Sequence, residues 1–326
     1  MKFTIKDIGE AKHVVGLQLE RFQDEIYLGQ PKYAQKILQT MGMWECDPKP
    51  IPMSPNWTHD EQSPKLTKKD EQLYKSCVMM LSYLAQQTRP DIVFAVNTLA
   101  QYQTDCREAD WKALEYLLRY LRGSWDYGLS YSRKGNKVAI LVTNDPNMLE
   151  DQKWCPSGYA DASYAQEKDR KSRSGHIFFM GGAAVTWYCK KQPVVALSST
   201  EAEYYALSEA VKEALWLRQL LGEIGIKLND PTHIHQDNLS TIAIALNPIQ
   251  HQRVKHMDVK VHFLRDHLDK DDIKLMYCPA EDMVADGITK AVPRVTHRKY
   301  TQLMGLRSLA TLQGKTNDQF TNDQRF

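Results

Sequence analysis

The 326-residue chain is long enough for about two ordinary domains, and its 42% apolar and 25% charged residues are typical of globular proteins. No run approaches the roughly 18 apolar residues of a membrane span, and the N-terminus is too polar for a secretory signal, so we expect an intracellular protein, cytoplasmic or nuclear, with no membrane partner. The net charge of +2 does not indicate a nucleic-acid partner, so any such binding face must come from local clusters of Lys and Arg.

The N-terminal half is predicted to contain one hairpin and then a mostly helical region. Alternating apolar and polar residues predict the hairpin over residues 13–28, and a proline in the first turn favours a helix over residues 31–41. After a proline-rich loop, residues 67–122 have helical spacing. An Arg-Pro-Asp sequence ending at Asp91 predicts a helix break, with Asp91 near the next N-cap. No acidic cluster in this half indicates chemistry.

The C-terminal half alternates strands and helices. The predicted strands are residues 138–142, a segment ending at Asp161, and residues 175–180, 184–188, 232–236 and 273–278. The predicted helices are residues 201–221, 240–246, 259–268 and a last one from about residue 281. Three antiparallel strands followed by alternating helices and strands imply an α/β fold with a mixed sheet flanked by helices.

The six cysteines are scattered along both halves and never occur as a C-x-x-C pair. This spacing predicts neither a zinc ribbon nor a disulfide framework. We therefore expect free and mostly buried thiols.

Four acidic residues in the C-terminal half are candidate metal ligands. Asp161 and Asp237 each end a predicted strand, which is where open α/β sheets hold ligands. Glu203 lies in the first turn of a predicted helix and Asp286 on the last one, so both can reach the same crevice. Clustered carboxylates repel one another unless cations bind, and hard oxygen ligands suit two Mg²⁺ or Mn²⁺ ions about 4 Å apart.

Each acid also has an ordinary structural explanation. Asp161 can cap a turn, and Asp237 can be the N-cap of the helix that follows it. Glu203 can be the N3 residue of a capping box whose N-cap is Thr200, and Asp286 can be a solvated helix residue. Taken singly, each acid is more often structural than catalytic, and spacing alone does not decide between the two explanations.

Longer motifs around these acids resemble a known family. The motifs are SRSGHIFF at residues 172–179, KKQPVVALSSTEAEY at 190–204 and EDMVADGITK at 281–290. They are similar, in order and spacing, to the ribonuclease H region of copia-type LTR retrotransposon Pol polyproteins. Upstream, GQPKY at residues 29–33 and TRPDI at 88–92 resemble the segment that follows the polymerase active site in the same polyproteins. The resemblance extends to about residue 306.

The resemblance implies a site, a cofactor and a reaction. Residue by residue, the family's four catalytic and metal-binding acids fall on Asp161, Glu203, Asp237 and Asp286. The implied fold is ribonuclease H-like, and the implied activity is hydrolysis of the RNA strand of an RNA/DNA hybrid by a water that two Mg²⁺ (or Mn²⁺) ions activate.

Basic residues near the predicted sheet are candidate contacts for the hybrid, because phosphates bind Lys and Arg. The candidates are Lys171, Arg173, Lys190 and Lys191, with Lys255 and Lys260 as further ones. For each of them a solvated surface role is equally expected. Trp187 and Tyr188 alternate along a strand, and core packing is favoured over base stacking.

The resemblance also shows what this sequence lacks. The family's Tyr-x-Asp-Asp polymerase motif does not occur in these 326 residues, so the chain alone is not expected to synthesise DNA. A polymerase-bearing chain of the same element is then a candidate partner. The loop at residues 277–280 has no histidine, and we assign no catalytic role to His256 or His262. The alternative function is a catalytically silent remnant that only binds nucleic acid or protein, or that serves as a subunit of a polymerase.

The resemblance divides the chain into five segments. They are the end of a reverse transcriptase palm (1–30), a thumb- and connection-like helical region (31–130), a linker or insertion (131–157), the ribonuclease H domain with its five-stranded mixed sheet (158–292) and a C-terminal tail (293–326). The insertion is centred on residues 134–153, and we expect disorder after residue 306 because the sequence there is polar.

Overall fold

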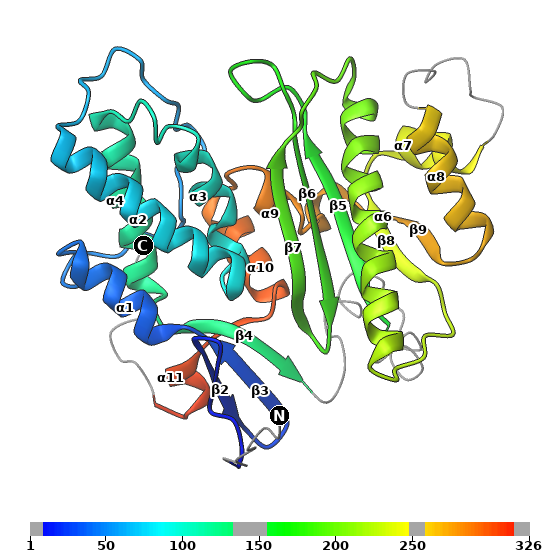
Figure 1. Cartoon of the computed structure of the whole chain (residues 1–326), viewed down its shortest axis with the longest axis horizontal. Coiled ribbons are helices and arrows are strands. Elements are labelled where there is room, and N and C mark those ends of the chain that lie inside the picture. The colour runs from blue at the N-terminus through cyan, green and yellow to red at the C-terminus, as the bar shows by residue number, and fades with distance from the viewer. Residues whose placement is uncertain (1–8, 133–154, 248–257, 316–326) are drawn as a thin grey trace, which may run out of the picture.

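The computed structural model describes residues 9–132, 155–247 and 258–315, which form two five-stranded sheets with helices around them (Figure 1). The first sheet has the order β1-β2-β3-β4-β10, and each neighbouring pair is antiparallel. Its strands are β1 (His13–Val14), β2 (Leu17–Arg21), β3 (Glu25–Gly29), β4 (Tyr127–Ser132) and β10 (Leu306–Ser308).

The second sheet has the order β7-β6-β5-β8-β9. Strand β6 is antiparallel to β5 and β7, whereas β8 is parallel to β5 and β9. Its strands are β5 (Ser157–Ser163), β6 (Arg173–Met180), β7 (Ala183–Lys191), β8 (Thr232–Gln236) and β9 (Ile273–Tyr277). The predicted α/β fold with a mixed five-stranded sheet and flanking helices is therefore confirmed.

Helices surround both sheets. In the first half they are α1 (Pro31–Thr40), α2 (Lys68–Gln87), the 3-10 turn η1 (Pro90–Ile92), α3 (Val93–Ala100) and α4 (Glu108–Gly123). In the second half they are α6 (Ser199–Glu223), α7 (Leu239–Leu246), α8 (Asp258–Asp269), the 3-10 turn η5 (Ala280–Asp282), α9 (Asp286–Thr289), α10 (Arg294–Leu303) and α11 (Leu309–Leu312). None of the helices in these described ranges is long and apolar enough to cross a membrane.

The second sheet lies between two layers of helices (Figure 1). Because side chains alternate along a strand, Ala160 and Phe178 face α6, and Tyr159 and Ile177 face the opposite side. Helices α6 and α8 cover the first face, and α3 and α9 pack against the second. The sheet is therefore buried on both faces.

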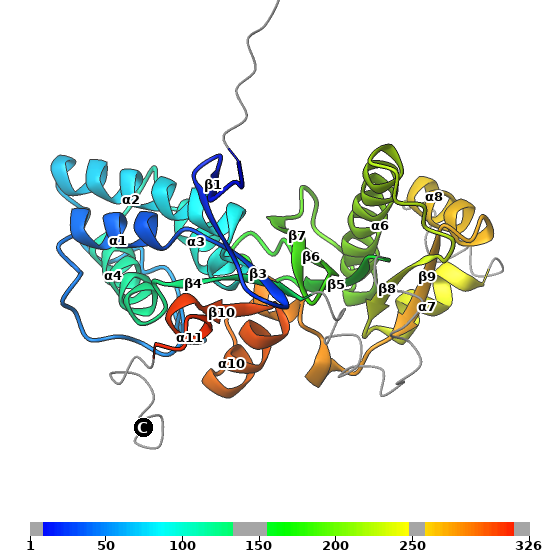
Figure 2. The same ribbon diagram turned by 90° about the horizontal axis from the view of Figure 1, so that it is seen from below.

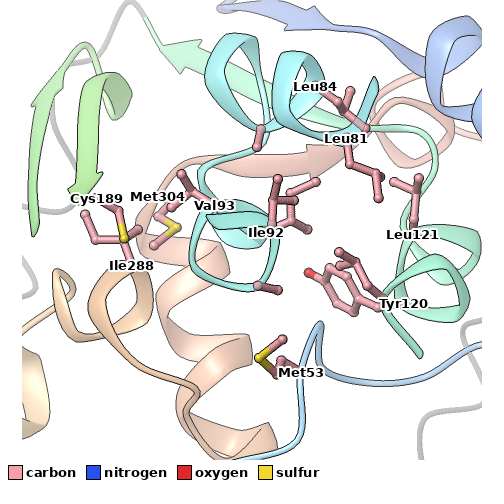
Figure 3. Packing of buried hydrophobic residues seen from close by; sticks show 14 of the residues in the cluster. Met53, Leu81, Leu84, Ile92, Val93, Tyr120, Leu121, Cys189, Ile288 and Met304 are labelled. Carbon is pink, nitrogen blue, oxygen red and sulfur yellow. The ribbon is translucent and has the colours of Figure 1, made fainter. Parts of the chain in front are cut away.

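The N-terminal helices and the second sheet share one hydrophobic core. Leu81 and Ile92 from the helical region lie in the same cluster as Ile288 and Met304 from the C-terminal segment (Figure 3). Hydrogen bonds join the same parts, because the Trp187 indole donates to the Ala85 carbonyl at 2.9 Å and the Asn97 amide donates to the Cys189 carbonyl at 2.8 Å. The two halves therefore form one packed unit.

A buried ion pair lies at the centre of the helical region. Arg89 and Asp91 are both almost fully buried, and the guanidinium donates to both carboxylate oxygens at 2.8 and 2.7 Å. Arg89 also donates to the carbonyl and hydroxyl of Ser124, and Tyr120 donates to Asp91 at 2.6 Å. Burial alone would raise the pKa of Asp91, but Arg89 and Tyr120 hold it below its ordinary value.

Asp91 lies next to the N-cap of α3, as the sequence predicted, but its side chain does not cap the helix. It lies inside η1 and pairs with Arg89, whereas the residue before α3 is Ile92. The predicted helix break after α2 is confirmed, and Asp91 serves as the counter-ion of the buried Arg89.

The prediction of disorder after residue 306 is wrong for the residues that follow immediately. Strand β10 pairs with β4 in register from Leu306 with Leu129 to Ser308 with Tyr127. Figure 2 shows the two strands side by side. The Ser308 hydroxyl donates to the Asp126 carboxylate at 2.5 Å, which fixes the start of α11. Pairing with β4 satisfies backbone groups that a polar tail would leave to water. Residues 316–326 lie outside the described residues.

Other boundaries differ from the expected ones. Strand β4 was not predicted, although Tyr127, Leu129 and Tyr131 alternate with Gly and Ser, because the segment is short and glycine is uncommon in strands. The helix expected from residue 281 is instead the turn η5 followed by the four-residue helix α9. The strand predicted at residues 138–142 and the insertion at 134–153 lie outside the described residues.

We predict that Arg89→Met destabilises the protein by about 3–5 kcal/mol, because it leaves the Asp91 carboxylate buried without its cation. Urea unfolding followed by circular dichroism measures this change. The matched control is Arg21→Met, which removes an exposed arginine that pairs with Glu10 at 4.0 Å and should cost no more than about 1 kcal/mol. Equal losses in the two variants would contradict the structural role given to the buried pair.

Candidate metal centre

Asp161 and Asp237 lie at the ends of neighbouring parallel strands. Asp161 is near the C-terminal end of β5, and Asp237 follows the last residue of β8. Parallel neighbours bring their carboxyl ends to the same edge of a sheet. The N-cap of α7 is Asn238, whose side chain accepts a hydrogen bond from the Thr241 amide at 3.0 Å. Asp237 therefore does not have the capping role that was its structural alternative.

Glu203 reaches the same edge from α6. The N-cap of this helix is Ser198, whose hydroxyl accepts from the Glu201 amide at 3.1 Å. The observed cap thus lies two residues before Thr200, the cap expected in the structural alternative. Glu203 instead accepts from the Ala162 amide of β5 at 2.9 Å and from the Gln236 side chain of β8 at 3.3 Å. These two bonds hold its carboxylate between the two strands.

Three of the four predicted acids are close together. Asp161, Glu203 and Asp237 each contribute one carboxylate oxygen to a group in which all atoms lie within 4.8 Å of one another. Asp161 and Glu203 are buried, and Asp237 is partly exposed. Carboxylate oxygens at this spacing are the donors that Mg²⁺ and Mn²⁺ prefer. The residues therefore fit a divalent metal ion.

The electrostatics of this group agree with that fit. Burial and then the charges of Asp161 and Asp237 raise the pKa of Glu203 well above its ordinary value. Burial and the charge of Asp161 also raise the pKa of Asp237. These shifts arise because like charges are held close together in a partly dry site. A bound cation reverses them, because it favours the ionised form of each acid.

The fourth acid lies beside this group on the short helix α9. Burial and then the charge of Asp161 raise the pKa of Asp286 to about 7. Lys290, which follows α9, places its ammonium 2.7 Å from one Asp286 oxygen. Burial alone would lower the pKa of Lys290, but Asp161 and Asp286 raise it. The structure thus arranges the four acids as a group of three with Asp286 next to it.

Thr289 fastens α9 to the sheet. Its hydroxyl donates a short hydrogen bond to Asp161 and is fully buried. Gly175, which is paired with Asp161 across β5 and β6, makes room for it, because a Cβ there would lie 2.4 Å from the Thr289 methyl group. Sequence analysis did not identify Gly175 or Thr289 as part of the site. A glycine inside a strand was the available signal, since it often marks a close approach of another element.

Three of the predicted basic contacts lie at the surface. Lys190 is exposed, and Lys171 and Lys191 are partly exposed. The ammonium of Lys191 lies 2.9 Å from a carboxylate oxygen of Asp169, and that of Lys171 lies 3.8 Å from the other. Lys260 lies on α8 instead, over the ring of Tyr205, and Lys255 lies outside the described residues.

Arg173 is not at the surface. It is 4% exposed, donates to Glu167 at 2.9 Å and lies over the ring of Phe94. A buried arginine that is paired in this way cannot reach a phosphate without leaving Glu167 uncompensated. We therefore correct the prediction that Arg173 contacts nucleic acid, and assign it to the packing between β6 and α3.

Both aromatic rings of β7 make contacts inside the protein. Trp187 packs against the core shared with the N-terminal helices, and Tyr188, on the other face, stacks on His176 with ring centroids 5.2 Å apart. These contacts agree with the predicted packing role. His262 lies on α8, and His256 lies outside the described residues.

Comparison with known proteins gives several relatives. The chain is 32% identical over 314 residues to the retrovirus-related Pol polyprotein from transposon TNT 1-94 of Nicotiana tabacum, covering 94% of this chain and 22% of that protein. It is 31% identical over 312 residues to the Pol polyprotein from transposon RE2 of Arabidopsis thaliana, covering 94% and 20%. The chain thus spans about a fifth of the length of these curated relatives. No family model matches it.

Among solved structures, the ribonuclease H1 of the archaeon Halobacterium salinarum NRC-1 aligns with 41% of this chain and 90% of its own. The sequence identity is 14% and the TM-score is 0.28.

We predict that Gly175→Ala displaces α9 and destabilises the protein, because the added methyl group overlaps Thr289 and contacts Ile288. The expected loss is about 1–3 kcal/mol, measured by urea unfolding. Gly222→Ala is the matched control, since Gly222 lies within α6 and its Cβ would meet no atom within 4 Å. That control should gain about 0.5–1 kcal/mol. A neutral Gly175→Ala would show that α9 does not need this close approach.

Proposed function

Because this chain belongs to the copia-type retrovirus-related Pol polyproteins of transposons, we propose that its second sheet carries a metal-dependent ribonuclease H. The proposed reaction is hydrolysis of the RNA strand of an RNA/DNA hybrid. The observation that carries the proposal is the group of Asp161, Glu203 and Asp237 at one edge of the sheet, with Asp286 beside it. These are the acids at which the family resemblance and the spatial arrangement agree.

The proposed metal ligands are the four acids. Asp161, Glu203 and Asp237 would hold one Mg²⁺ or Mn²⁺ ion, and Asp286 would help to hold a second. Bound ions of this kind lower the pKa of a water molecule and offset the charge that develops on a phosphodiester during hydrolysis.

The chain's own residues keep these ligands in position. The Ala162 amide and the Gln236 side chain fix the Glu203 carboxylate, and the Thr289 hydroxyl orients Asp161. Hydrogen bonds of this kind, made behind the metal ligands, limit how far the carboxylates can turn. The site is therefore largely arranged before substrate arrives, which favours catalysis.

The proposed substrate face is the edge of the sheet next to the acids. In the sheet, Asp161 pairs with Gly175 and Gly175 with Cys189, so Lys190 and Lys191 follow directly on β7. With Lys171, these lysines offer positive charge to phosphates, while a hybrid also exposes 2′-hydroxyl groups in a wide minor groove. We therefore propose Lys171, Lys190 and Lys191 as contacts for the hybrid.

The alternative of a catalytically silent remnant is not favoured, because all four acids are present and none has a capping role. The proposal does not extend to DNA synthesis. The Tyr-x-Asp-Asp motif is absent from the 326 residues, so the proposal assigns this chain nuclease activity alone. A chain that carries the polymerase centre remains the proposed protein partner.

We predict that Asp237→Asn reduces cleavage of the RNA strand at least about 100-fold, because even residues that only support metal ligands account for 10- to 100-fold. The substitution should leave folding intact, since it keeps the shape and relieves repulsion. The measurement uses a hybrid labelled on the RNA strand, with Mg²⁺ or with EDTA. Asp230→Asn, an exposed change just before β8, is the control and should cleave like the wild type. Undiminished cleavage by Asp237→Asn would overturn the assignment.

We also predict that the double variant Lys190→Gln with Lys191→Gln binds the hybrid less tightly than the wild type does. Its affinity should also depend less on the salt concentration. The slope of log affinity against log salt should fall by about 0.7–0.9 for each phosphate that is no longer neutralised by a lysine. Binding in EDTA, followed by fluorescence anisotropy at several salt concentrations, separates this effect from cleavage. The control double variant, Lys212→Gln with Lys227→Gln, lowers the net charge by the same amount at exposed positions on α6 and after its end. It should have the same salt slope as the wild type. If both double variants had the same slope, Lys190 and Lys191 would be excluded as contacts for the hybrid.

A further inference from the structure

Among the described residues of the acid site, Lys290 alone carries a positive charge. It follows α9 directly, and its ammonium lies 2.7 Å from an Asp286 oxygen. Its charge also acts on Asp161 and, more weakly, on Asp237. The function proposed above assigns roles to the four acids but leaves this lysine without one.

The contacts of the preceding residue fix the position of the Lys290 backbone. Thr289, the residue before it, donates to Asp161 and packs against Gly175, so the backbone at this point cannot move away from the sheet. The side chain has more freedom, because it is 37% exposed and its stem of four carbons is flexible. The ammonium can therefore leave Asp286 for solvent without any change in the fold.

We propose that Lys290 is a tethered cation that occupies the Asp286 side of the site and is displaced by a second divalent ion. The inference rests on the proposed function, because it concerns the same metal site. Its consequence is that the two ions bind in unequal steps. The first uses Asp161, Glu203 and Asp237, whose group does not include the partner of Lys290. The second must compete with Lys290 for Asp286.

Charge balance favours this order. When one divalent ion and the Lys290 ammonium are present, they offset three of the four carboxylate charges, so a second ion meets a site that is almost neutral. Removal of the lysine charge leaves two negative charges for that ion. The lysine should therefore weaken the second binding step far more than the first. Lys290 is in this sense a positioning residue that sets how many ions the site holds at a given concentration.

The test is a titration of the metal-free protein with Mn²⁺, followed by calorimetry and by the electron paramagnetic resonance signal of free Mn²⁺. We expect two unequal steps in the wild type. In Lys290→Met the second step should tighten by about tenfold or more, with little change in the first. Lys299→Met is the matched control, because Lys299 makes an ion pair of 2.6 Å with Asp282 outside the acid group. It should bind Mn²⁺ like the wild type.

Folding is checked by circular dichroism, and Lys290→Gln replaces Lys290→Met if the latter does not fold. An unchanged second step in the folded variant, or two equal steps in the wild type, would overturn the inference. Absence of any Mn²⁺ binding by the wild type would overturn both the inference and the metal site. Hybrid cleavage is measured separately. A wild type that binds Mn²⁺ in two steps but does not cleave would contradict the proposed function and leave the role of Lys290 standing.

Discussion

The buried pair of Arg89 and Asp91 begins a chain of polar contacts that joins the two halves of the protein. Tyr120 gives its single hydroxyl hydrogen to Asp91, so the contact of 3.0 Å between that hydroxyl and His297 requires the imidazole to donate. Burial keeps His297 neutral by lowering its pKa to about 4. This chain of contacts connects η1, α4 and α10, and α10 follows the helix that carries Asp286. One end of the acid site is therefore anchored by polar groups far from it in the sequence.

The acid site itself combines two opposed requirements. Its carboxylates must be close enough to share cations, yet closeness in a buried place raises their pKa values and costs stability. Hydrogen bonds from Ala162, Gln236 and Thr289 and the positive charge of Lys290 offset part of the repulsion between these carboxylates. Rigid elements on both faces of the sheet then keep the acids together. A site of this kind stores repulsion that ligand binding can relieve.

Sequence reasoning recovered those parts in which the local pattern determines the structure. The strands β5 to β9 and the helices α6 to α8 follow from alternation and helical spacing, and the four acids follow from motifs that extend well beyond them. Spacing alone could not decide whether Glu203 and Asp237 were caps, because the true caps, Ser198 and Asn238, are close by in the sequence. The burial of Arg173 and the contact of Thr289 with Asp161 depend on tertiary packing. The strand glycine Gly175 indicates only that some element approaches closely, and not which residue does so.

The pairing of β10 with β4 has a consequence for how the protein is made. Strand β4 is an inner strand only when Leu306 to Ser308 have been added, and these residues come after the whole second sheet. During synthesis the first sheet therefore presents an unpaired edge while more than half of the chain is still being produced. Late, long-range closure of this kind is slow and exposes the nascent chain to mispairing. Strand β10 thus completes the first sheet only after the acid site has been synthesised.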